Sequence, residues 1–489
     1  MTDITMDVDT KALRQRILTL AIQGKLTDQR KEDGTAQALY NQIQEEKQKL
    51  IKEKKIKKTK KLPEIKEDEI PFDIPENWMW ARLGDIFQVN PRNHVENENI
   101  DVSFLPMASI DEGYGSNYHP EIRKWKEVKK GFTHFANNDV VLAKISPCFQ
   151  NLKSAFIHDL VNGIGAGTTE LHVLRMFANT IDAQYLLYFV QNPELINAGV
   201  KTFKGVVGQQ RISTDFIKEY LIPLPPLAEQ KRIADKVSSL FVQLDAIDKA
   251  YEEYRELQQT MKSRLLQQAI QGKLTDQRKE DGNAQDLYNQ IQEEKQRLIK
   301  EKKIKKEKTL PEITADEIPF EIPENWMWVR FLDILDIRDG THDTPQYVPK
   351  GVPLITGKNI SKGYLDFSTA KQISYEDAKK INKRSKVDYN DIIFAMIGTI
   401  GNPIIIKENV LFSIKNVALL KHFSDLIDMD YVLSYLYWFM KEMNNTAVGV
   451  AQKFVSLGTI RSSIIPLPPL AEQKRIVEKL NKLLPLCEA

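Results

Sequence analysis

Cysteine and histidine are scarce in this sequence of 489 residues. Cys148 and Cys487 are the only cysteines and lie far apart in the chain, which excludes a disulfide framework and a zinc site built on cysteines. The 7 histidines include no pair at the helical spacing of metal ligands. We therefore expect no metal and no cofactor in this chain, and a reducing, cytoplasmic setting.

Long hydrophobic runs are also lacking. The longest, Ile392 to Ile406, is interrupted by glycine and proline and is too short to cross a bilayer. The first residues, MTDITMDVDT, are acidic and do not have the basic and then apolar pattern of a signal peptide. We expect no membrane segment and no membrane partner.

Neither sign of charge predominates, since 69 Lys and Arg residues offset 67 Asp and Glu residues. The net charge of +2 therefore says little about partners, although lysine is concentrated locally. The lysine runs Lys47 to Lys61 and Lys295 to Lys308 have two interpretations. They could bind phosphate groups, or they could form a solvated helix face whose charge nearby glutamates relieve.

Complete enzyme signatures are missing as well. Gly163 to Gly167 has the glycines of a cofactor-binding loop, but no strand, turn and helix unit surrounds it, so we interpret it as a flexible loop. Gly357-Lys358 lacks the preceding glycine of a phosphate-binding loop. Asp343 to Tyr347 differs from the Asn/Asp-Pro-Pro-aromatic loop of amino-methyltransferases, because it has Thr before a single Pro. The sequence therefore predicts a non-catalytic chain.

What the chain does contain is a duplication. AIQGKLTDQRKEDG occupies residues 21–34 and recurs unchanged at 269–282, and the similarity continues to IPENWMW in both copies. The tryptophans of IPENWMW are Trp78 and Trp80 in the first copy and Trp326 and Trp328 in the second. A packing role for them is favoured over stacking on bases.

A second shared block, IPLPPLAEQKRI, occupies residues 222–233 and 465–476. The material between the blocks, residues 82–221 and 330–464, shows almost no identity between the copies. The scaffold is thus duplicated, while the two inserts have diverged.

The segment from Leu227 to Gln271 contains neither glycine nor proline, and it predicts one long helix. Its apolar residues recur at intervals of four and three, as in a coiled coil. At 1.5 Å per residue, such a helix runs for roughly 65 Å. A stripe of this length must lie against another helix, and the chain ends match its two ends in sequence. The stripe residues are Ile233, Val237, Leu240, Leu244, Ile247, Tyr251, Tyr254, Leu257, Met261 and Leu265.

The second copy of this long helix is split between the two ends of the chain, as expected for a circular repeat. It is also incomplete, since Val242 to Gln258 has no clear counterpart. The domain boundaries that we predict are residues 1–75 for an amino-terminal helical half-repeat and basic linker, 76–223 for the first insert domain, 224–322 for the long helix, charged helix and linker, 323–466 for the second insert domain and 467–489 for the final helix.

The remaining elements follow from local patterns. Helices are expected over Lys11 to Gln23, Ala36 to about Lys58, Asp182 to Val190, Asp430 to Met443 and Leu470 to Leu484. Strands are expected over Asp139 to Ile145, Leu152 to Ile157 and Glu170 to Met176 in the first insert, and over Asp391 to Ile397, Ile404 to Ile406 and Val417 to Leu420 in the second.

Polar and basic side chains gather beside glycines in the expected loops of both inserts. Arg, Lys, Asn and Gln are suited to reading base edges, and loops on a rigid core carry such contacts. The candidates in the first insert are Lys144, Ser146, Gln150, Asn151, Lys153, Lys204, Gln209, Gln210 and Arg211. Those in the second are Arg338, Thr341, His342, Lys358, Asn359, Lys383 and Arg384. Each taken singly is more often an ordinary surface residue.

In combination, these features resemble the specificity subunit of type I restriction-modification systems. The resemblance rests on IPLPPLAEQKRI before a long heptad helix, AIQGKLT after it, and IPENWMW at the start of each insert. Residues 339–345, DGTHDTP, and 355–360, ITGKNI, are similar to segments common in that family. The resemblance covers essentially the whole chain.

The resemblance implies an α+β fold with two globular target-recognition domains of mixed α/β content. Long antiparallel coiled-coil helices would separate them in a pseudo-twofold circular repeat. Each domain would read one half of a bipartite site in double-stranded DNA, and the subunit itself would lack catalysis. The implied partners are two modification subunits that bind S-adenosylmethionine and methylate adenine, and restriction subunits that use ATP and Mg to translocate and cleave DNA. We expect docking through Leu240, Leu244, Ile247 and Leu257 of the long helix.

Two other classes of function stay open from the residues alone. One is a DNA methyltransferase or nuclease with an unrecognised active site, which methyl transfer by the purified chain would establish. The other is a coiled-coil scaffold without a nucleic-acid role, which salt-dependent binding to duplex DNA would exclude.

Overall fold

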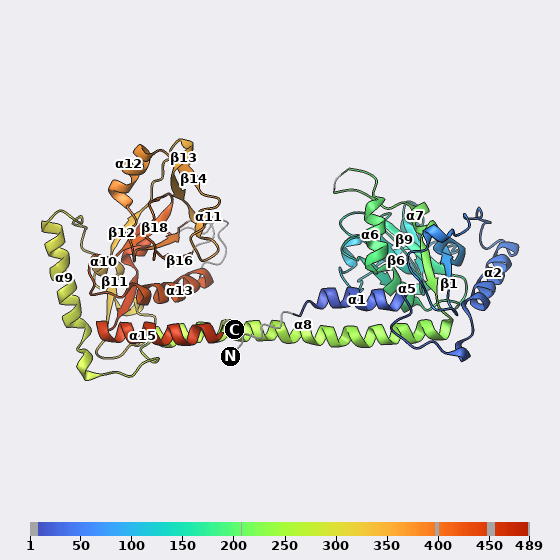
Figure 1. Ribbon diagram of the computed structural model, residues 1–489, viewed down its shortest axis with the longest axis horizontal. Coiled ribbons are helices and arrows are strands. Elements are labelled where there is room, and N and C mark those ends of the chain that lie inside the picture. Colours follow the sequence, from blue (N-terminus) through green and yellow to red (C-terminus); the bar gives the residue numbers. More distant parts are fainter. Residues whose placement is uncertain (1–7, 207, 397–400, 447–454, 488–489) are drawn as a thin grey trace. The chain divides into compact units, whose positions relative to one another are not determined.

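The computed structural model describes residues 8–206, 208–396, 401–446 and 455–487, with the backbone alone for 442–446. The chain forms two compact units, one that ends at Tyr251 and one that begins at Glu252. We call them the amino-terminal and the carboxy-terminal unit. Figure 1 labels their elements.

The amino-terminal unit contains two four-stranded sheets and one strand pair, β1-β10. One sheet is antiparallel with the order β2-β9-β6-β7. The other has the order β4-β3-β8-β5, in which β3 and β8 run parallel. The strands are β1 (Met79–Arg82), β2 (Phe87–Val89), β3 (Asp101–Leu105), β4 (Glu121–Lys124), β5 (Thr133–Ala136), β6 (Val140–Ala143), β7 (Ser154–Phe156), β8 (Ile164–Gly167), β9 (Leu171–Met176) and β10 (Leu221–Leu224).

The carboxy-terminal unit contains a four-stranded sheet β12-β18-β15-β16, a three-stranded sheet β14-β13-β17 and the strand pair β11-β19. As in the other unit, one sheet is antiparallel and the other has a parallel pair, β13 with β17. The strands are β11 (Met327–Arg330), β12 (Asp336–Asp339), β13 (Tyr347–Ile355), β14 (Lys371–Ile373), β15 (Ile392–Ala395), β16 (Gly401–Ile405), β17 (Ser413–Ile414), β18 (Val417–Lys421) and β19 (Ile464–Leu467).

The α-helices are numbered along the chain (Figure 1). The first group is α1 (Thr10–Ile22), α2 (Ala36–Lys52), α3 (Leu83–Ile86), α4 (Trp125–Val128), α5 (Ala183–Val190), α6 (Pro193–Lys201), α7 (Thr214–Glu219) and α8 (Leu227–Ile270). The second is α9 (Ala284–Lys300), α10 (Phe331–Ile334), α11 (Gly357–Ile360), α12 (Tyr375–Ser385), α13 (Met429–Thr446), α14 (Leu457–Ser462) and α15 (Leu470–Leu483). The fold is α+β, with two sheet-rich units and long helices.

The central strands β6 and β15 are buried on both faces, which is why they are continuous apolar runs in the sequence. Val140 and Leu142 of β6 pack into the core that the helices cover, whereas Val141 packs into the core of the second sheet. In β15, Phe394 likewise faces the helices, and Ile393 faces the other way. Each insert is therefore a layer of helices on one sheet, with the other sheet beyond it.

The repeated sequence blocks meet at one buried carboxylate in each unit. Glu229, in the first turn of α8, is 0 % exposed and accepts hydrogen bonds from Trp78 Nε1 and Gln29 Nε2, both at 2.9 Å. Glu472 of α15 accepts from Trp326 Nε1 at 2.8 Å and from Gln277 Nε2 at 2.6 Å. A buried carboxylate needs such donors, which explains why AIQGKLTDQ, IPENWMW and LAEQKRI recur together.

The strand pairs that close the inserts also have the same register. Met79 pairs with Leu224 in β1-β10, and Met327 pairs with Leu467 in β11-β19. Trp78 and Trp326 are each 6 % exposed, so the packing role predicted for the four tryptophans is confirmed for these two. Trp80 and Trp328 are half-buried, and each ring lies 5.0 Å from a phenylalanine ring.

The long helix is confirmed over Leu227–Ile270, but its buried face differs from the predicted stripe. Ile233, Val237 and Leu244 are buried as expected, whereas the buried residue between them is Phe241, and Leu240 is only half-buried. The face shifts because Phe241 contacts the rings of Tyr114 and Tyr188 in the insert.

Helix α1 runs along this part of α8 (Figure 1). Thr10 Oγ1 donates to Asp248 at 2.6 Å, and Arg14 Nη2 donates to Asp245 at 2.5 Å. On the same helix α8, Ile247 is 37 % and Leu257 is 57 % exposed, so the expectation of a buried stripe is wrong at these positions. In the carboxy-terminal unit, the last turns of α8 pack with α15 in one core.

Two further expectations need correction. Helix α2 ends at Lys52 rather than near Lys58, because Lys54 has a φ of 56° and its neighbour Lys55 bonds back to Leu50. The segment Gly163 to Gly167 is not a flexible loop, since most of it forms β8 in the middle of a sheet. A Cβ on Gly165 would lie 2.3 Å from the Phe135 ring, so glycine is required there by close packing.

The other elements agree with the prediction to within a few residues, with two qualifications. β16 begins at Gly401, earlier than the expected Ile404. Two parts of the prediction lie outside the described residues. One is Ile397, the end of an expected strand, and the other is the outer ends of the first and last predicted domains, 1–7 and 488–489.

Candidate nucleic-acid interface

In the amino-terminal unit, two candidate loops that are far apart in sequence lie side by side. The backbone N–H of Ser146 donates to the Gln210 carbonyl at 2.8 Å, and the N–H of Gln210 donates to Ser146 Oγ at 3.1 Å. Lys204 and Arg211 form a bridge across the second loop. Gln150, Lys204 and Gln209 are exposed at these loops. The fold therefore brings most of the first set of candidates together at one end of β6 and β9.

Several candidates in this set have internal roles. Lys153 Nζ donates to the carbonyl oxygens of Ile110 at 2.9 Å and Met107 at 3.3 Å. Ser146 is 8 % exposed, and its hydroxyl holds the loop. Asn151 and Lys144 are both half-buried. The backbone N–H of Lys144 donates to the Glu170 carbonyl at 2.9 Å.

A buried histidine anchors the second loop. His172 of β9 is 1 % exposed, with Nε2 at 3.3 Å from the Ile212 carbonyl and Nδ1 at 3.3 Å from Asn90 Nδ2. Burial lowers the pKa of His172 to about 4, while its hydrogen bond to Ile212 opposes that shift. The imidazole is therefore neutral at physiological pH. A lone histidine in the sequence does not indicate such a buried structural role.

In the carboxy-terminal unit, most candidates gather around Asp339 at the end of β12. Asp339 is 6 % exposed and pairs with Arg384 of α12 and with His342, whose Nε2 lies 2.8 Å from its carboxylate. His342 Nδ1 also lies 2.9 Å from the Asn416 side chain. Thr341 bridges to Lys415, and Lys383 is exposed next to Arg384.

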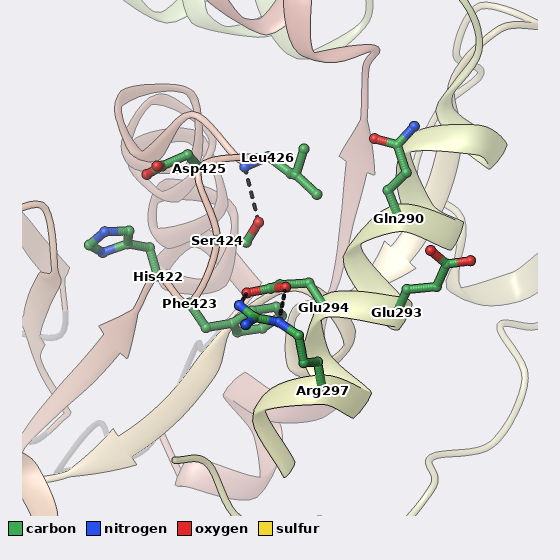
Figure 2. A pocket seen from close by; sticks show the side chains of 9 residues that line it. All are labelled: Gln290, Glu293, Glu294, Arg297, His422, Phe423, Ser424, Asp425 and Leu426. Atoms are coloured by element: carbon green, nitrogen blue, oxygen red, sulfur yellow. Dashed lines mark hydrogen bonds and ion pairs between the residues drawn. The ribbon is translucent and has the colours of Figure 1, made fainter. Parts of the chain in front are cut away.

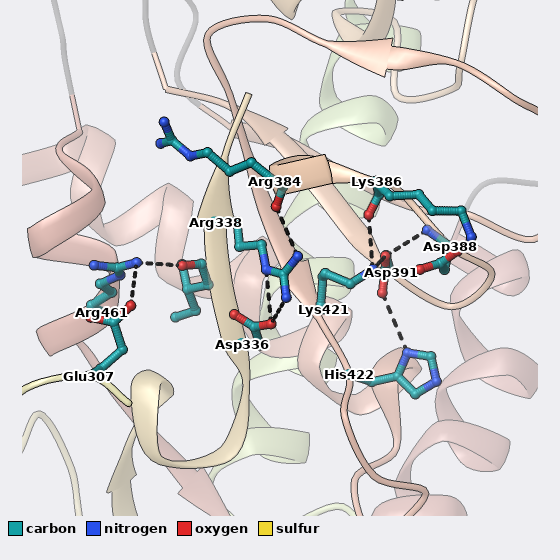
Figure 3. A network of polar contacts seen from close by, with 11 residues as sticks. Glu307, Asp336, Arg338, Arg384, Lys386, Asp388, Asp391, Lys421, His422 and Arg461 are labelled. Atoms are coloured by element: carbon teal, nitrogen blue, oxygen red, sulfur yellow. Dashed lines mark hydrogen bonds and ion pairs between the residues drawn. The ribbon is translucent and has the colours of Figure 1, made fainter. Parts of the chain in front are cut away.

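Arg338 and Arg384 are further connected (Figure 3). Arg338 donates to Asp336 at 2.5 and 2.9 Å, and its Nη1 donates to the Arg384 carbonyl at 2.9 Å. These side chains present cations at the surface that acidic neighbours orient, which gives a fixed geometry for anionic or hydrogen-bonding groups.

Lys358 and Asn359 lie apart from this cluster, in α11. Lys358 is exposed, whereas Asn359 is 4 % exposed. The amide of Asn359 accepts from the Thr356 N–H at 3.0 Å and donates to the Asp366 carbonyl at 3.2 Å. Its polar atoms thus hold a loop.

The sequence reasoning missed the acidic residues that orient these cations. Glu170 binds Arg211, and Asp336 and Asp339 bind Arg338 and Arg384. A second network, also in Figure 3, joins Asp391 to Lys421 Nζ at 2.6 Å. Acidic residues at strand ends are a weak sequence signal, because most such residues are solvated.

The lysine runs begin with one inward-facing lysine in each copy. Lys47 Nζ donates to the Asp85 carbonyl at 3.1 Å, and Lys295 Nζ donates to the Leu332 carbonyl at 2.5 Å. Burial lowers the pKa of both amines, opposed by nearby carboxylates. Most of the following lysines are exposed, in agreement with the solvated interpretation; phosphate binding stays untested.

An open groove of about 690 Å³ lies between α9 and the segment from His422 to Leu426 (Figure 2). Glu293, Glu294 and Asp425 line it, and its cation Arg297 pairs with Glu294 at 2.6 Å. A groove with this charge repels phosphate, so the DNA-facing candidates lie elsewhere.

The described residues were expected to contain neither a metal site nor a membrane-spanning helix. Over residues 8–206, 208–396, 401–446 and 455–487, no group of three or more His, Cys, Asp and Glu side chains is placed to hold a metal ion. In the same described part of the chain, the helices are all too short or too polar to cross a membrane.

Comparison with known proteins identifies the family. The family model for the type I restriction modification DNA specificity domain matches residues 75–253 and 323–487. The specificity subunit of the type I restriction enzyme EcoAI from Escherichia coli is 34 % identical over a match of 528 positions. The match covers 98 % of this chain and 89 % of the relative.

Two solved structures share the fold. A chain in a structure of the assembly and conformational transition of the type I restriction-modification system matches with a TM-score of 0.63 and 19 % identity, over 86 % of this chain and 93 % of that one. The HsdS subunit from Thermoanaerobacter tengcongensis matches with a TM-score of 0.52 and 19 % identity, over 86 % and 92 %. The chain therefore belongs to the specificity subunits of type I restriction-modification systems, the non-catalytic subunits that recognise the DNA target.

Proposed function

We propose that each unit reads one half of a bipartite site in double-stranded DNA. The observation that supports this most is the contrast between the units: the residues around Glu229 and Glu472 are the same, whereas the candidate loops on the two inserts differ completely. Identical supports that carry different side chains favour two different half-sites.

The proposed DNA-facing set is narrower than the sequence suggested. It comprises the exposed or half-exposed candidates of the two clusters, together with the exposed Lys358 of α11, and excludes side chains that hold loops from within. In the amino-terminal unit it contains Lys144, Gln150, Lys204, Gln209 and Gln210. In the carboxy-terminal unit it contains Arg338, Thr341, His342, Lys358, Lys383 and Arg384.

The modification subunits are proposed to dock along α8, one on each unit. The exposed apolar residues of α8 support this: Val242 and Ile247 in the amino-terminal unit, and Leu257 and Met261 in the carboxy-terminal unit. Single exposed apolar residues are ordinary, but a row of them on a helix is typical of an interaction surface. Leu244, which is 7 % exposed, is withdrawn from the docking set.

The wider assembly is also a proposal. Two modification subunits would supply S-adenosylmethionine and methylate adenine, and restriction subunits would supply ATP- and Mg-dependent cleavage. The same proposal includes the domain boundaries predicted above and a pseudo-twofold circular repeat with paired antiparallel helices. It also includes a location in the cytoplasm. The matching registers of β1-β10 and β11-β19 support the repeat.

An exchange of inserts tests the division of labour. The second insert, residues 326–465, is replaced by the insert of a relative, and methylated adenines are mapped in a genome that expresses the chimera with its modification subunit. One half-site should change, while the other half-site and the gap stay the same. A change in both halves would count against independent recognition.

A further inference from the structure

A pocket of about 400 Å³ lies in the amino-terminal unit, and none of the proposed DNA-facing residues lines it. Aromatic and aliphatic side chains form most of its wall. They are Phe72, Trp80, Phe189, Leu195, Ala198, Tyr220 and Leu221. A volume of this size is typical of a site for a small molecule.

The duplicated scaffold shows what the same place holds in the other unit. Tyr185 of α5 donates its hydroxyl to the Pro223 carbonyl at 2.7 Å, and Tyr431 of α13 donates to the Pro466 carbonyl at 2.8 Å. Phe72 and Trp80 are 5.0 Å apart between ring centroids, as are Phe320 and Trp328. The surroundings of the pocket are therefore built in the same way twice.

In the carboxy-terminal unit, an indole takes this place. Trp438 of α13 lies edge-on to Phe320 at 5.3 Å and lies 5.6 Å from Tyr435. Counted from the paired tyrosines, the residue that corresponds to Trp438 is Asn192, beyond the end of α5. The residues that correspond to Phe320 and Tyr435 are Phe72 and Phe189, and both line the open pocket.

Two more features of the pocket point to a ligand. Asn192 lines it, is 0 % exposed, and its Nδ2 atom has no hydrogen-bond partner among the described residues. A buried amide N–H without an acceptor is costly, so a group that brings an acceptor within reach is favoured. The lining also includes three carboxylates. Glu69 pairs with Arg82 at 2.9 Å, whereas Glu194 and Glu219 have no ion pair with any residue that the structure describes. Negative charge at Glu194 and Glu219 disfavours an anionic ligand.

We propose that this pocket binds a small, uncharged aromatic molecule that carries a hydrogen-bond acceptor. Its ring takes the place that the Trp438 indole takes in the other unit, and its acceptor meets Asn192 Nδ2. The proposal is independent of DNA recognition, because it rests on the pocket and on its filled counterpart. An aromatic side chain of another polypeptide has the same ring chemistry, and the experiment separates the two sources.

Binding is measured on the purified full chain by ligand-observed NMR and calorimetry. Benzamide, whose carbonyl can accept from Asn192, and indole, which offers the ring with only an N–H donor, are the uncharged probes, and benzamide should bind more tightly. Benzoate is the anionic control. For ligands of this size we expect dissociation constants on the order of 0.1 to 1 mM. Benzoate should bind at least tenfold more weakly. Failure of both uncharged probes to bind, or equal binding of benzoate, would overturn the proposal.

Two variants locate the site. Ala198→Trp places an indole in the pocket from α6 and should weaken indole binding at least tenfold. Trp438→Ala should open the corresponding place in the carboxy-terminal unit and raise the stoichiometry from one indole to two, as cavities left by large apolar side chains bind aromatic molecules. Circular dichroism checks that each variant is folded.

If Ala198→Trp does not fold, the change in stoichiometry of Trp438→Ala decides the matter on its own. Unchanged stoichiometry in that variant would contradict the equivalence of the two places. N-Acetyltryptophanamide, a ring attached to peptide groups, should bind more weakly than indole. Tighter binding of this probe would overturn the small-molecule assignment in favour of a polypeptide side chain.

Discussion

The guanidinium of Arg211 donates two hydrogen bonds to the carboxylate of Glu170, at 2.8 and 3.0 Å. Its remaining Nη1 donates to the Gln209 carbonyl at 2.8 Å. The pair lowers the pKa of Glu170, with the hydrogen bond from Arg211 as the main cause and burial opposing it. Arg211 therefore fixes the loop that carries Lys204 and Gln209, and these neighbours are the better candidates for contact with DNA.

Lys204→Ala should weaken binding to specific and scrambled DNA equally, and should reduce the slope of log K against log salt by about 1, because one phosphate contact is lost. The measurement is a titration of duplex DNA at several salt concentrations. Lys11→Ala, at an exposed position on α1 and outside the lysine runs, serves as the matched control. An unchanged slope in Lys204→Ala would remove this lysine from the interface.

His172 should make the stability of the amino-terminal unit depend on pH. Its folded-state pKa of about 4 lies below the ordinary value of 6.5, so the unfolded chain binds the proton first. The stabilisation is complete above pH 6.5 and is lost as the pH falls toward 4, by up to about 3 kcal/mol at 1.36 kcal/mol per pH unit. Urea unfolding at a series of pH values measures it.

The variant His172→Gln should lose the part of this dependence that His172 contributes, whereas His342→Gln, at an exposed position, should keep it. A smaller dependence should remain in His172→Gln, because burial also lowers the pKa of His134 in the same unit. Equal pH dependence in His172→Gln and in the parent chain would show that other groups are responsible.

Leu244→Asp should destabilise the amino-terminal unit by about 3 kcal/mol or more, because it buries a charge in the core. Leu244 is 7 % exposed, whereas Leu240 is half-buried, so Leu240→Asp should cost much less. Thermal unfolding followed by circular dichroism compares the two. A larger loss for Leu240→Asp would indicate that the helix face predicted from the heptad pattern is the buried one.

Leu257→Asp should leave the chain folded and weaken its assembly with the modification subunit, since this side chain is 57 % exposed on α8. The readout is the stoichiometry of the purified complex by analytical ultracentrifugation. Glu256→Ala, at an exposed neighbouring position, is the control. Normal stoichiometry in Leu257→Asp would exclude this part of α8 as a docking surface.

Lengthening α8 tests whether the helix sets the gap between the half-sites. Four residues inserted between Asp248 and Lys249 add roughly one turn and about 6 Å. The insertion follows the contact of Thr10 with Asp248, so pairing with α1 is kept. The gap should grow by one or two base pairs at about 3.4 Å each, with both half-sites unchanged. Mapping of methylated adenines gives the answer, and an unaltered gap would assign the spacing to other parts of the complex.

The sequence by itself determined the duplication, the long helix and the central strands. These features depend on local pattern: Val140 to Ala143 and Ile392 to Ala395 are apolar without interruption, and α8 contains no helix breaker. It also indicated the family, because the repeated blocks are long and nearly unchanged. The strands β3 and β8 of the second sheet escaped prediction, since they are short and partly polar or glycine-rich.

Only the tertiary structure decided which polar residues face outward. Lys153 and Asn359 look like surface residues in the sequence, yet their partners include carbonyls at Met107 and Asp366 that folding brings to them. Glu229 gives no sign in its own neighbourhood that Trp78, 151 residues away, donates to it. Periodicity reports the face of an element, but the partner of a polar group is set by contacts between distant segments, because a buried donor or acceptor takes whichever partner the packed chain provides.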